Sequence, residues 1–247
     1  MERAAEIAFA NQLQNAREAA LKDAEAFDGI LHAVERLGKF LTKRSDGNLG
    51  QYGTKLQEIA ARSPLAEEVP KRFRGLLTTF SSLLDLVRHA RNDAFHEGAA
   101  ARHLTGHAIE LALILEDALR SSEAPVVADY MVRNPVCAEL WQPIGFIRQQ
   151  MLASSFSFLP VLNEHGIWCL VSDRAIAAYL GTNWIERKDR MAFALGKAAI
   201  QLKRAKLVQE DTSLEKALTA LRDAPLLVRQ KGKRTRILGI VTAFDLL

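Results

Sequence analysis

The sequence predicts a chain of two parts, an all-helical bundle followed by a mixed α/β half that contains an internal repeat. Apolar residues recur at helical spacing up to about residue 120, which indicates amphipathic helices. Beyond residue 125, short apolar strands alternate with helices, and this pattern occurs twice. Between the two parts, the stretch 120–125 loses its periodicity and gains small and helix-breaking residues. We therefore expect one domain over 1–122 and the other over 125–247.

The composition is that of a soluble globular protein with enough residues for two hydrophobic cores. Of its 247 residues, 49% are hydrophobic and 25% are charged. A net charge of +4 permits contact with nucleic acid without requiring it. Charged residues interrupt the N-terminal stretch and no apolar run is long enough to span a membrane, so we expect neither a secretory signal nor a membrane contact. Cys137 and Cys169 have apolar neighbours and are expected to be buried free thiols in a reducing compartment, which predicts a cytoplasmic protein.

Five helices are expected in the first part. The stretch Ser45-Asp46-Gly47-Asn48 is a clear stop signal, and Ser63-Pro64 ends a short helix. The expected helices cover residues 3–25, 28–43, 54–62, 70–89 and 100–120.

A polar stretch, residues 91–98, separates the last two of these helices and carries the chemistry of the first part. It contains Arg91, Asn92 and His96 and closes with Gly98. Histidine can take or give a proton near neutral pH, and a nearby arginine can hold a phosphate and neutralise its developing charge. Together these groups suit cleavage of a phosphodiester by the neighbouring ribose hydroxyl, which in principle needs no metal.

The spacing of these residues restricts how they can meet. At about 100° per residue, Asn92 and His96 share a helix face, whereas Arg91 and His96 are roughly 140° apart. Either the helix breaks here, for which Asp93 and Gly98 are suitable residues, or two copies of the motif meet across a dimer axis. A twofold axis would bring two arginines and two histidines into one cleft.

An Arg-Asn-x3-His motif between two long apolar helices resembles the signature of the HEPN superfamily, the helical nucleotide-binding and ribonuclease domains of prokaryotic toxin and defence systems. The resemblance covers residues 1–122. It implies a four- or five-helix bundle that dimerises and cuts RNA without metal, leaving a cyclic phosphate. By position, Arg91 would hold the phosphate, His96 would transfer the proton and Asn92 would be the polar residue after the arginine. Some toxin members carry a modifiable tyrosine two residues after the histidine, where this chain has Gly98.

Two other interpretations of this region remain open. An Arg/Asn/His patch at a helix end is often only a solvated terminus whose arginine lies near the last carbonyls. Alternatively, His103 and His107 lie four apart on a helix with Glu110 three further on, a spacing that can present two imidazoles and a carboxylate to one metal ion. No further ligand set is evident, so we expect no metal.

The second part is expected to contain two related units. The first has a helix over 140–152, strands over 156–162 and 167–171, and a helix over 172–180; the second has a helix over 212–221 and strands over 226–229 and 236–241. A capping box of Thr212 with Glu215 is expected to open the helix of the second unit. Leu159-Pro160-Val161 aligns with Ala224-Pro225-Leu226, and Leu170-Val171-Ser172 aligns with Ile240-Val241-Thr242, which indicates internal duplication.

The end of the second unit carries a pattern suited to a nucleotide. A carboxylate just inside a helix can accept both ribose hydroxyls, while a threonine hydroxyl and the helix N-terminal amides can receive phosphate. Thr242 and Asp245 have this placement, although a simple helix cap beside a core strand is the competing interpretation. The first unit keeps a hydroxyl at Ser172 but has Ala175 where the carboxylate belongs.

Residues 129–136 and 239–246 make this half resemble a tandem pair of CBS domains, a Bateman module. The first copy would cover about 125–181, a connector helix about 184–206 and the second copy about 207–247. The resemblance implies that Asp245 holds the ribose, and that Thr242, with Ser172 in the first copy, helps hold the phosphate, of a regulatory adenine nucleotide (AMP, ADP or ATP). The chain stops at Leu247, before a final helix completes a turn or two.

Basic residues form two clusters in this half, one along the connector and one at residues 231–236. Solvated surface is the simpler interpretation, and nucleotide phosphates or an RNA backbone are the alternatives. The fold expected overall is α + α/β, a HEPN-like helical bundle followed by a tandem CBS pair. The function expected is an adenine-nucleotide-regulated, metal-independent endoribonuclease of the toxin or defence type that acts as a homodimer on RNA. The alternative is a non-catalytic nucleotide-sensing scaffold whose helical domain mediates dimerisation or partner binding.

Overall fold

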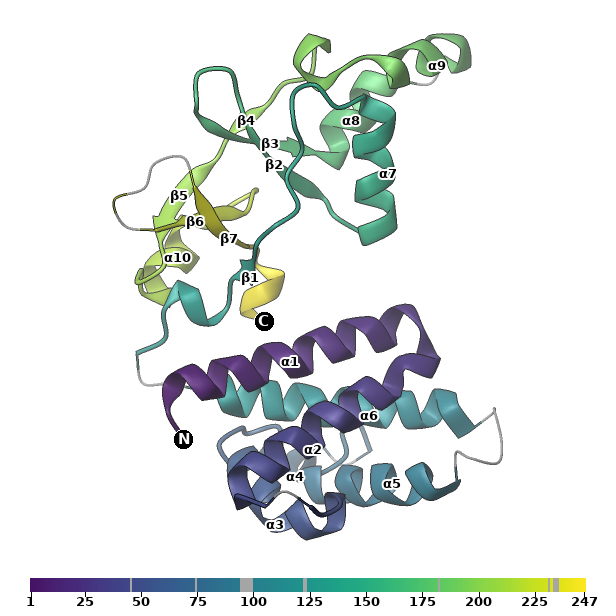
Figure 1. Cartoon of the computed structure of the whole chain (residues 1–247), viewed down its shortest axis with the longest axis vertical. Coiled ribbons are helices and arrows are strands. Elements are labelled where there is room, and N and C mark those ends of the chain that lie inside the picture. The colour runs from purple at the N-terminus through teal and green to yellow at the C-terminus, as the bar shows by residue number, and fades with distance from the viewer. Residues whose placement is uncertain are drawn as a thin grey trace. The chain divides into compact units, whose positions relative to one another are not determined.

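The chain divides into two compact units, unit 1 (Met1–Glu123) and unit 2 (Ala124–Leu247), which are described separately (Figure 1). The computed structural model describes residues 1–44, 46–73, 75–93, 100–121, 124–181, 183–230, 232 and 236–247, without the side chains of residues 24, 25, 90–93, 100–103 and 184.

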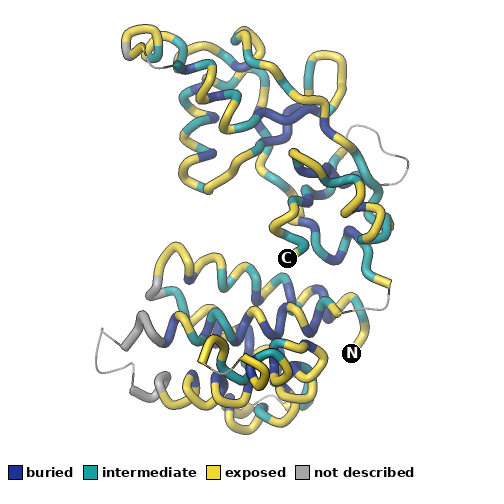
Figure 2. The backbone as a smooth tube through the Cα atoms, turned by 180° about the vertical axis from the view of Figure 1, so that it is seen from behind, coloured by how far each residue is buried: buried dark blue, intermediate teal, exposed yellow. Residues whose placement is uncertain are grey.

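Unit 1 is a helical bundle built around its last helix. Its helices are α1 (Arg3–Lys22), η1 (Ala24–Phe27), α2 (Asp28–Thr42), α3 (Leu49–Ala60), α4 (Glu68–Arg72), α5 (Phe80–Asp93) and α6 (Ala100–Arg120). Helix α6 contacts α1, α2, α3 and α5, and its side chains Leu111, Leu115 and Leu119 are fully buried. Figure 2 shows buried positions along the inward faces of these helices, as expected for amphipathic helices around one core.

Two helix boundaries in unit 1 differ from the prediction. Helix α3 begins at Leu49 and not at residue 54, because Asn48 and Gln51 form a capping box in which each side chain accepts the other's backbone N–H at 3.2 Å. The helix expected over 70–89 is two helices, α4 and α5. They are separated by a segment in which Gly75 has a positive φ of 92°, and α5 begins at Phe80, whose N–H donates to the carbonyl of Ala66.

Hydrogen bonds and ion pairs of charged side chains connect the end of α6 to α1 and to the end of α3. Arg3 donates from Nη1 to the carbonyl of Leu119 at 2.9 Å, and Arg62 donates from Nη2 to the carbonyl of Ser121 at 3.1 Å. Both arginines also bind Glu6, at 3.3 Å and 2.7 Å. Guanidinium groups at a helix C-terminus satisfy carbonyls that have no partner inside the helix, so this cluster stabilises the last turn of α6.

Unit 2 contains two small mixed layers of strands and helices. Its elements are η2 (Val127–Asp129), β1 (Val132–Arg133), α7 (Ile144–Ser154), β2 (Phe158–Leu162), β3 (Trp168–Ser172), α8 (Asp173–Leu180), α9 (Trp184–Ala192), η3 (Leu195–Lys197), β4 (Lys203–Arg204), β5 (Lys206–Gln209), α10 (Leu214–Ala220), β6 (Leu226–Arg229), β7 (Ile237–Val241) and η4 (Phe244–Leu246). The strands form one sheet in the order β2-β3-β4 and another in the order β1-β7-β6-β5.

The two sheets exchange strands in a symmetric way. The short strand β1, near the start of the first copy, pairs antiparallel with β7 of the second copy, Val132 opposite Ile240. Strand β4, which precedes the second copy, pairs antiparallel with β3 of the first copy, Lys203 opposite Leu170. Leu170 and Ile240 therefore occupy equivalent positions, as the sequence alignment of these residues predicted. This reciprocal topology supports an internal duplication.

The register of β2 and β6 corrects the other part of the predicted alignment, the part that begins at Leu159. Leu159 pairs with Val171, and Leu226 pairs with Val241, so Leu159 corresponds to Leu226 and not to Ala224. The predicted alignment is therefore wrong by two positions. A shift of two residues keeps the same side of the strand facing inward, so the apolar pattern of the sequence does not reveal it.

The connector is also shorter than predicted, because the helix expected over about 184–206 ends at Ala192. After it the short helix η3 bonds to the first copy: Leu195 N–H donates to the carbonyl of Gln142 and Gly196 N–H to that of Leu140, at 2.9 and 2.8 Å. A Cβ on Gly196 would lie 3.1 Å from Leu140 Cβ, so this close approach favours glycine. The short helix η3, followed by β4 and β5, occupies the rest of the range that was expected to be helix.

The capping box expected at the start of α10 is wrong as well. Ser213 is the N-cap residue and makes no side-chain cap hydrogen bond. The hydroxyl of Thr212 instead accepts the N–H of Gln209 at 3.1 Å, closing the turn between β5 and α10.

Candidate functional site

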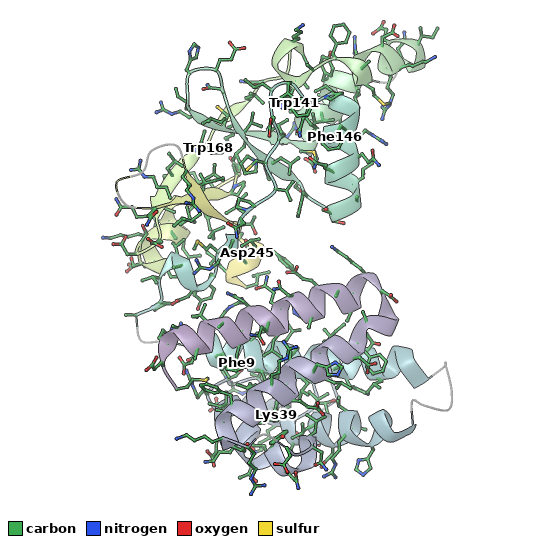
Figure 3. All side chains as sticks on the ribbon, viewed as in Figure 1. Phe9, Lys39, Trp141, Phe146, Trp168 and Asp245 are labelled. Atoms are coloured by element: carbon green, nitrogen blue, oxygen red, sulfur yellow. The ribbon has the colours of Figure 1, made fainter. Side chains whose placement is uncertain are left out.

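The candidate nucleotide site lies where β7 ends and the short helix η4 begins. The Oδ2 atom of Asp245 accepts the backbone N–H of Thr242 at 2.7 Å and the Thr242 hydroxyl at 2.8 Å. The Asp245 N–H donates in return to the Thr242 hydroxyl at 3.4 Å. The two residues that the sequence singled out are therefore in direct contact, both of them half-buried (Asp245 is labelled in Figure 3).

This reciprocal arrangement has the geometry of a helix cap, which was the competing interpretation. A carboxylate oxygen held by two donors is fixed in position, and it can exchange the hydroxyl donor of Thr242 for a hydroxyl of a ligand. The neighbouring side chain, Phe244, is 75% exposed, so the end of the chain presents an apolar ring beside the capped carboxylate. The same atoms can therefore serve as a cap without ligand and as a ribose acceptor with one.

The first copy repeats this cap without the carboxylate. Ser172 is the N-cap of α8, and its hydroxyl accepts the N–H of Ala175 at 3.1 Å. Ala175 stands three residues after the hydroxyl, as Asp245 does in the second copy, but it has no side-chain acceptor. The nearest carboxylate in sequence, Asp173, is exposed and bonds the adjacent Arg174 N–H. Only the second copy combines hydroxyl and carboxylate at this position.

Strand β1 supports the candidate site and could not be recognised from the sequence. Asn134, with a left-handed φ of 49°, donates its N–H to the carbonyl of Leu238 at 3.0 Å. Gly239 faces β1, and a Cβ there would lie 2.7 Å from Met131 Sδ and 2.8 Å from the carbonyl of Val132. Gly239 is therefore the only local signal of this contact, because a two-residue strand has no periodicity.

Two of the three residues proposed for RNA cleavage lie at the end of α5. Arg91 and Asn92 belong to its last turn, their side chains are outside the described set, and His96 lies outside the described residues altogether. The buried face of α5 includes Leu84 and Val87, and Arg91 follows Val87 by four residues. Since residues four apart lie on the same side of a helix, Arg91 occupies the same face, on a helix that contacts α6 (Figure 1). The proximity of Arg91 to His96 remains a prediction.

The metal hypothesis based on His103 and His107 also remains untested, because the side chain of His103 is not described. Among the described residues, no group of three histidine, cysteine or acidic side chains has a metal-binding arrangement. In the same part of the chain, no helix combines the length and the apolar character needed to cross a membrane.

Both cysteines are free thiols, Cys169 buried and Cys137 half-buried. Burial raises the pKa of both thiols, and the charge of Glu139 raises that of Cys137 further. A raised pKa lowers the thiolate population, so neither side chain has the properties of a nucleophile.

Comparisons with known proteins give similarities to solved structures alone, since no family model and no curated protein matches the chain. CBSX2 from Arabidopsis thaliana is 17% identical, with 49% of this chain and 90% of that chain covered and a TM-score of 0.40. CBSX2 in complex with AMP is 20% identical, with 49% and 92% covered and a TM-score of 0.37. A CBS domain-containing protein of unknown function from Bacillus anthracis is 17% identical, with 49% and 88% covered and a TM-score of 0.41. These CBS-domain structures cover the C-terminal half.

Proposed function

We propose that this chain is a nucleotide-sensing regulatory protein whose unit 2 binds an adenine nucleotide (AMP, ADP or ATP) at Thr242 and Asp245. The observation that carries the proposal is the carboxylate–hydroxyl pair at the end of β7, which is complete in the second copy and lacks its carboxylate in the first. A duplicated scaffold with a single complete pair is suited to one such ligand.

The chemistry of binding follows from the hydrogen-bond inventory. Asp245 accepts the two ribose hydroxyls, and Thr242 donates its released hydroxyl to a phosphate oxygen. The Thr242 hydroxyl bond to Asp245, 2.8 Å long without ligand, is exchanged in the process. Ser172 offers a second hydroxyl, at the equivalent end of β3, without a carboxylate partner for a ribose.

Calorimetric titration with AMP, ADP and ATP tests this proposal. Asp245→Ala removes the ribose acceptor, and Asp245→Asn keeps one cap oxygen while removing the charge. We expect both variants to weaken binding by at least about tenfold, the loss typical of a charged hydrogen-bond acceptor. Glu164→Ala is the matched control, because Glu164 is an exposed carboxylate in the turn between β2 and β3. The proposed site is contradicted if the wild type does not bind, or if both Asp245 variants bind as tightly as the wild type.

We propose metal-independent RNA cleavage by unit 1 as a second candidate function; its support is that Arg91 belongs to the last turn of α5, four residues after the buried Val87. In this mechanism His96 takes the proton from a ribose 2′-hydroxyl, whose oxygen attacks the adjacent phosphorus. Arg91 holds the phosphate oxygens while the 2′-O–P bond forms and the P–O5′ bond breaks. His96 then gives the proton that it took to the leaving 5′-oxygen, and the other product is a cyclic phosphate. Asn92 orients the phosphate, and a homodimer brings two copies of the motif into one cleft.

Incubation with RNA in excess chelator tests the second candidate. Wild-type protein is expected to cleave, whereas His96→Ala and Arg91→Ala are expected to be inactive. His89→Ala is the matched control, since His89 is an exposed imidazole on the same helix with its Nδ1 2.7 Å from the Asp85 carbonyl oxygen. A wild type that is inactive with and without each nucleotide refutes the nuclease and leaves a nucleotide-sensing scaffold. If cleavage changes with nucleotide, the ligand binds one dimer arrangement more tightly than the other.

A further inference from the structure

Helices α1 and α2 flank an open groove that neither candidate function uses. The groove has a volume of about 470 Å³, which is within the usual range for small-molecule sites. Ala16, Gly29 and Ala33 are the small residues of its lining. The nearest atom to a Cβ placed on Gly29 is Ala16 Cβ, at 3.7 Å. Small residues from both helices therefore leave the space that the groove occupies.

Four polar side chains line the walls, two from each helix. Gln12 and Asn15 come from α1, three residues apart, and His32 and Arg36 come from α2, four residues apart. Residues at these spacings lie on the same side of a helix, so each helix directs its pair toward the groove. Beyond Arg36 on the same side of α2, Phe40 packs against Phe9 of α1 with ring centroids 5.1 Å apart, which holds the two helices together at this end.

None of these four side chains makes a side-chain hydrogen bond or an ion pair with another residue that the structure describes. All four are exposed, so their polar groups face solvent, whereas Arg3, Arg17 and Arg62 of unit 1 bind carboxylates. An arginine left without a carboxylate, beside two amides and an imidazole, retains its capacity to bind an external acceptor.

The charge of the lining selects the class of ligand. Among the lining residues that the structure describes there is no carboxylate, whereas Arg36 contributes a permanent positive charge. Amide NH₂ groups, an imidazole N–H and a guanidinium are all donors, and a phosphate group presents enough acceptor oxygens to satisfy all of them at once. The guanidinium matches two phosphate oxygens in a bidentate geometry.

We propose that the α1/α2 groove, formed by Gln12, Asn15, His32 and Arg36, is a binding site for a phosphate group. The phosphate comes either from a phosphorylated small molecule, for which the volume is sufficient, or from the backbone of an RNA strand that passes over unit 1. This site depends neither on Thr242 and Asp245 nor on the Arg91 motif.

Binding is tested by nuclear magnetic resonance titration of the full chain with inorganic phosphate and with ribose 5-phosphate. The amide of Gly29 and the side-chain amides of Gln12 and Asn15 are the reporters, which separates this groove from any ligand bound in unit 2. A second arm measures fluorescence anisotropy of a short single-stranded RNA. Arg36→Gln removes the charge, and Lys39→Gln, on the same helix but outside the groove, is the control with an equal change of net charge (Lys39 is labelled in Figure 3).

We expect saturable chemical-shift changes at these three reporters. The affinity obtained from them is expected to be at least about tenfold weaker in Arg36→Gln and to change less than about twofold in Lys39→Gln. Shifts with ribose 5-phosphate identify a small-molecule site, whereas loss of RNA affinity in Arg36→Gln alone, without small-molecule shifts, identifies a backbone site. Absence of binding in both arms overturns the proposal. Equal losses in the two variants also overturn it, because they indicate general electrostatic attraction and not a built site.

Discussion

Gly38, in the middle of α2, is expected to be irreplaceable for a reason that can be worked out from its surroundings. A Cβ at this position would lie 2.5 Å from Tyr52 Cγ and 2.6 Å from Tyr52 Cβ, on α3. Tyr52 is fully buried, and its Cβ is fixed to the backbone, so no change of rotamer removes the contact. The two helices would have to move apart.

The magnitude follows from two opposing effects. Replacing a helical glycine by alanine normally stabilises by about 0.5–1 kcal/mol. Overpacking a rigid contact costs about 1–3 kcal/mol, and the short distances here place Gly38→Ala at the upper end. We therefore expect a net loss of about 2 kcal/mol for Gly38→Ala. Gly106→Ala on α6 is the matched control, because a Cβ there meets nothing within 4 Å, and it is expected to stabilise by up to about 1 kcal/mol.

The assay can assign the change to unit 1. All three tryptophans, Trp141, Trp168 and Trp184, belong to unit 2, while the long helices α1 and α6 belong to unit 1. In urea unfolding, Gly38→Ala is expected to shift the circular dichroism transition and to leave the tryptophan fluorescence transition unchanged. Equal stability of Gly38→Ala and Gly106→Ala would show that α2 and α3 are not packed as described.

The remaining predictions concern charge, strand exchange and the thiols. Burial alone raises the pKa of Glu6, but hydrogen bonds from Arg62 and Arg3 outweigh it and lower the pKa below 4.5. Its contribution to the free energy of unfolding is therefore complete above the unfolded pKa and is lost as pH falls through the folded pKa, so the circular dichroism midpoints of wild type and Glu6→Gln should differ at pH 7 and converge as the pH falls below the folded pKa. Gly239→Ala is expected to lower the free energy of unfolding, measured by tryptophan fluorescence, by about 1–3 kcal/mol, because the added methyl group would collide with Met131 and separate β1 from β7. An unchanged free energy of unfolding contradicts the strand exchange. Both cysteines should react slowly with a thiol reagent at pH 7.5 in the native protein and rapidly in urea, and fast native reaction would contradict their raised pKa values.

Much of the architecture was predictable where the pattern is long and local. The helices over 3–22, 28–42 and 100–120 match expected ranges because apolar residues recur on one face over several turns. The strand over 226–229 was predicted with its observed bounds, since it is a short apolar run between turn residues. The gap between α4 and α5 was missed because leucines continue through it, and periodicity alone does not show where a helix pauses.

The candidate nucleotide site was predictable in part. Hydroxyl and carboxylate three residues apart after a strand are visible in the sequence as Thr242 and Asp245, and the missing carboxylate is visible as Ala175. Their mutual hydrogen bonds were the competing helix-cap interpretation, and the distances show that the cap is present. Arg36 was not singled out, because its significance depends on having no partner and on α1 lying beside it.

The sequence by itself determined the helical faces, the duplication and the identity of the groups at the end of each copy, because these are properties of neighbouring residues. Only the tertiary structure decided the exchange of β1 and β4, the end of the connector helix at Ala192 and the groove between α1 and α2. The two exchanged strands have two residues each and therefore no period. Their stability comes from pairing with Cys169, Leu170, Gly239 and Ile240, residues distant in the chain, so no local pattern in the sequence could specify them.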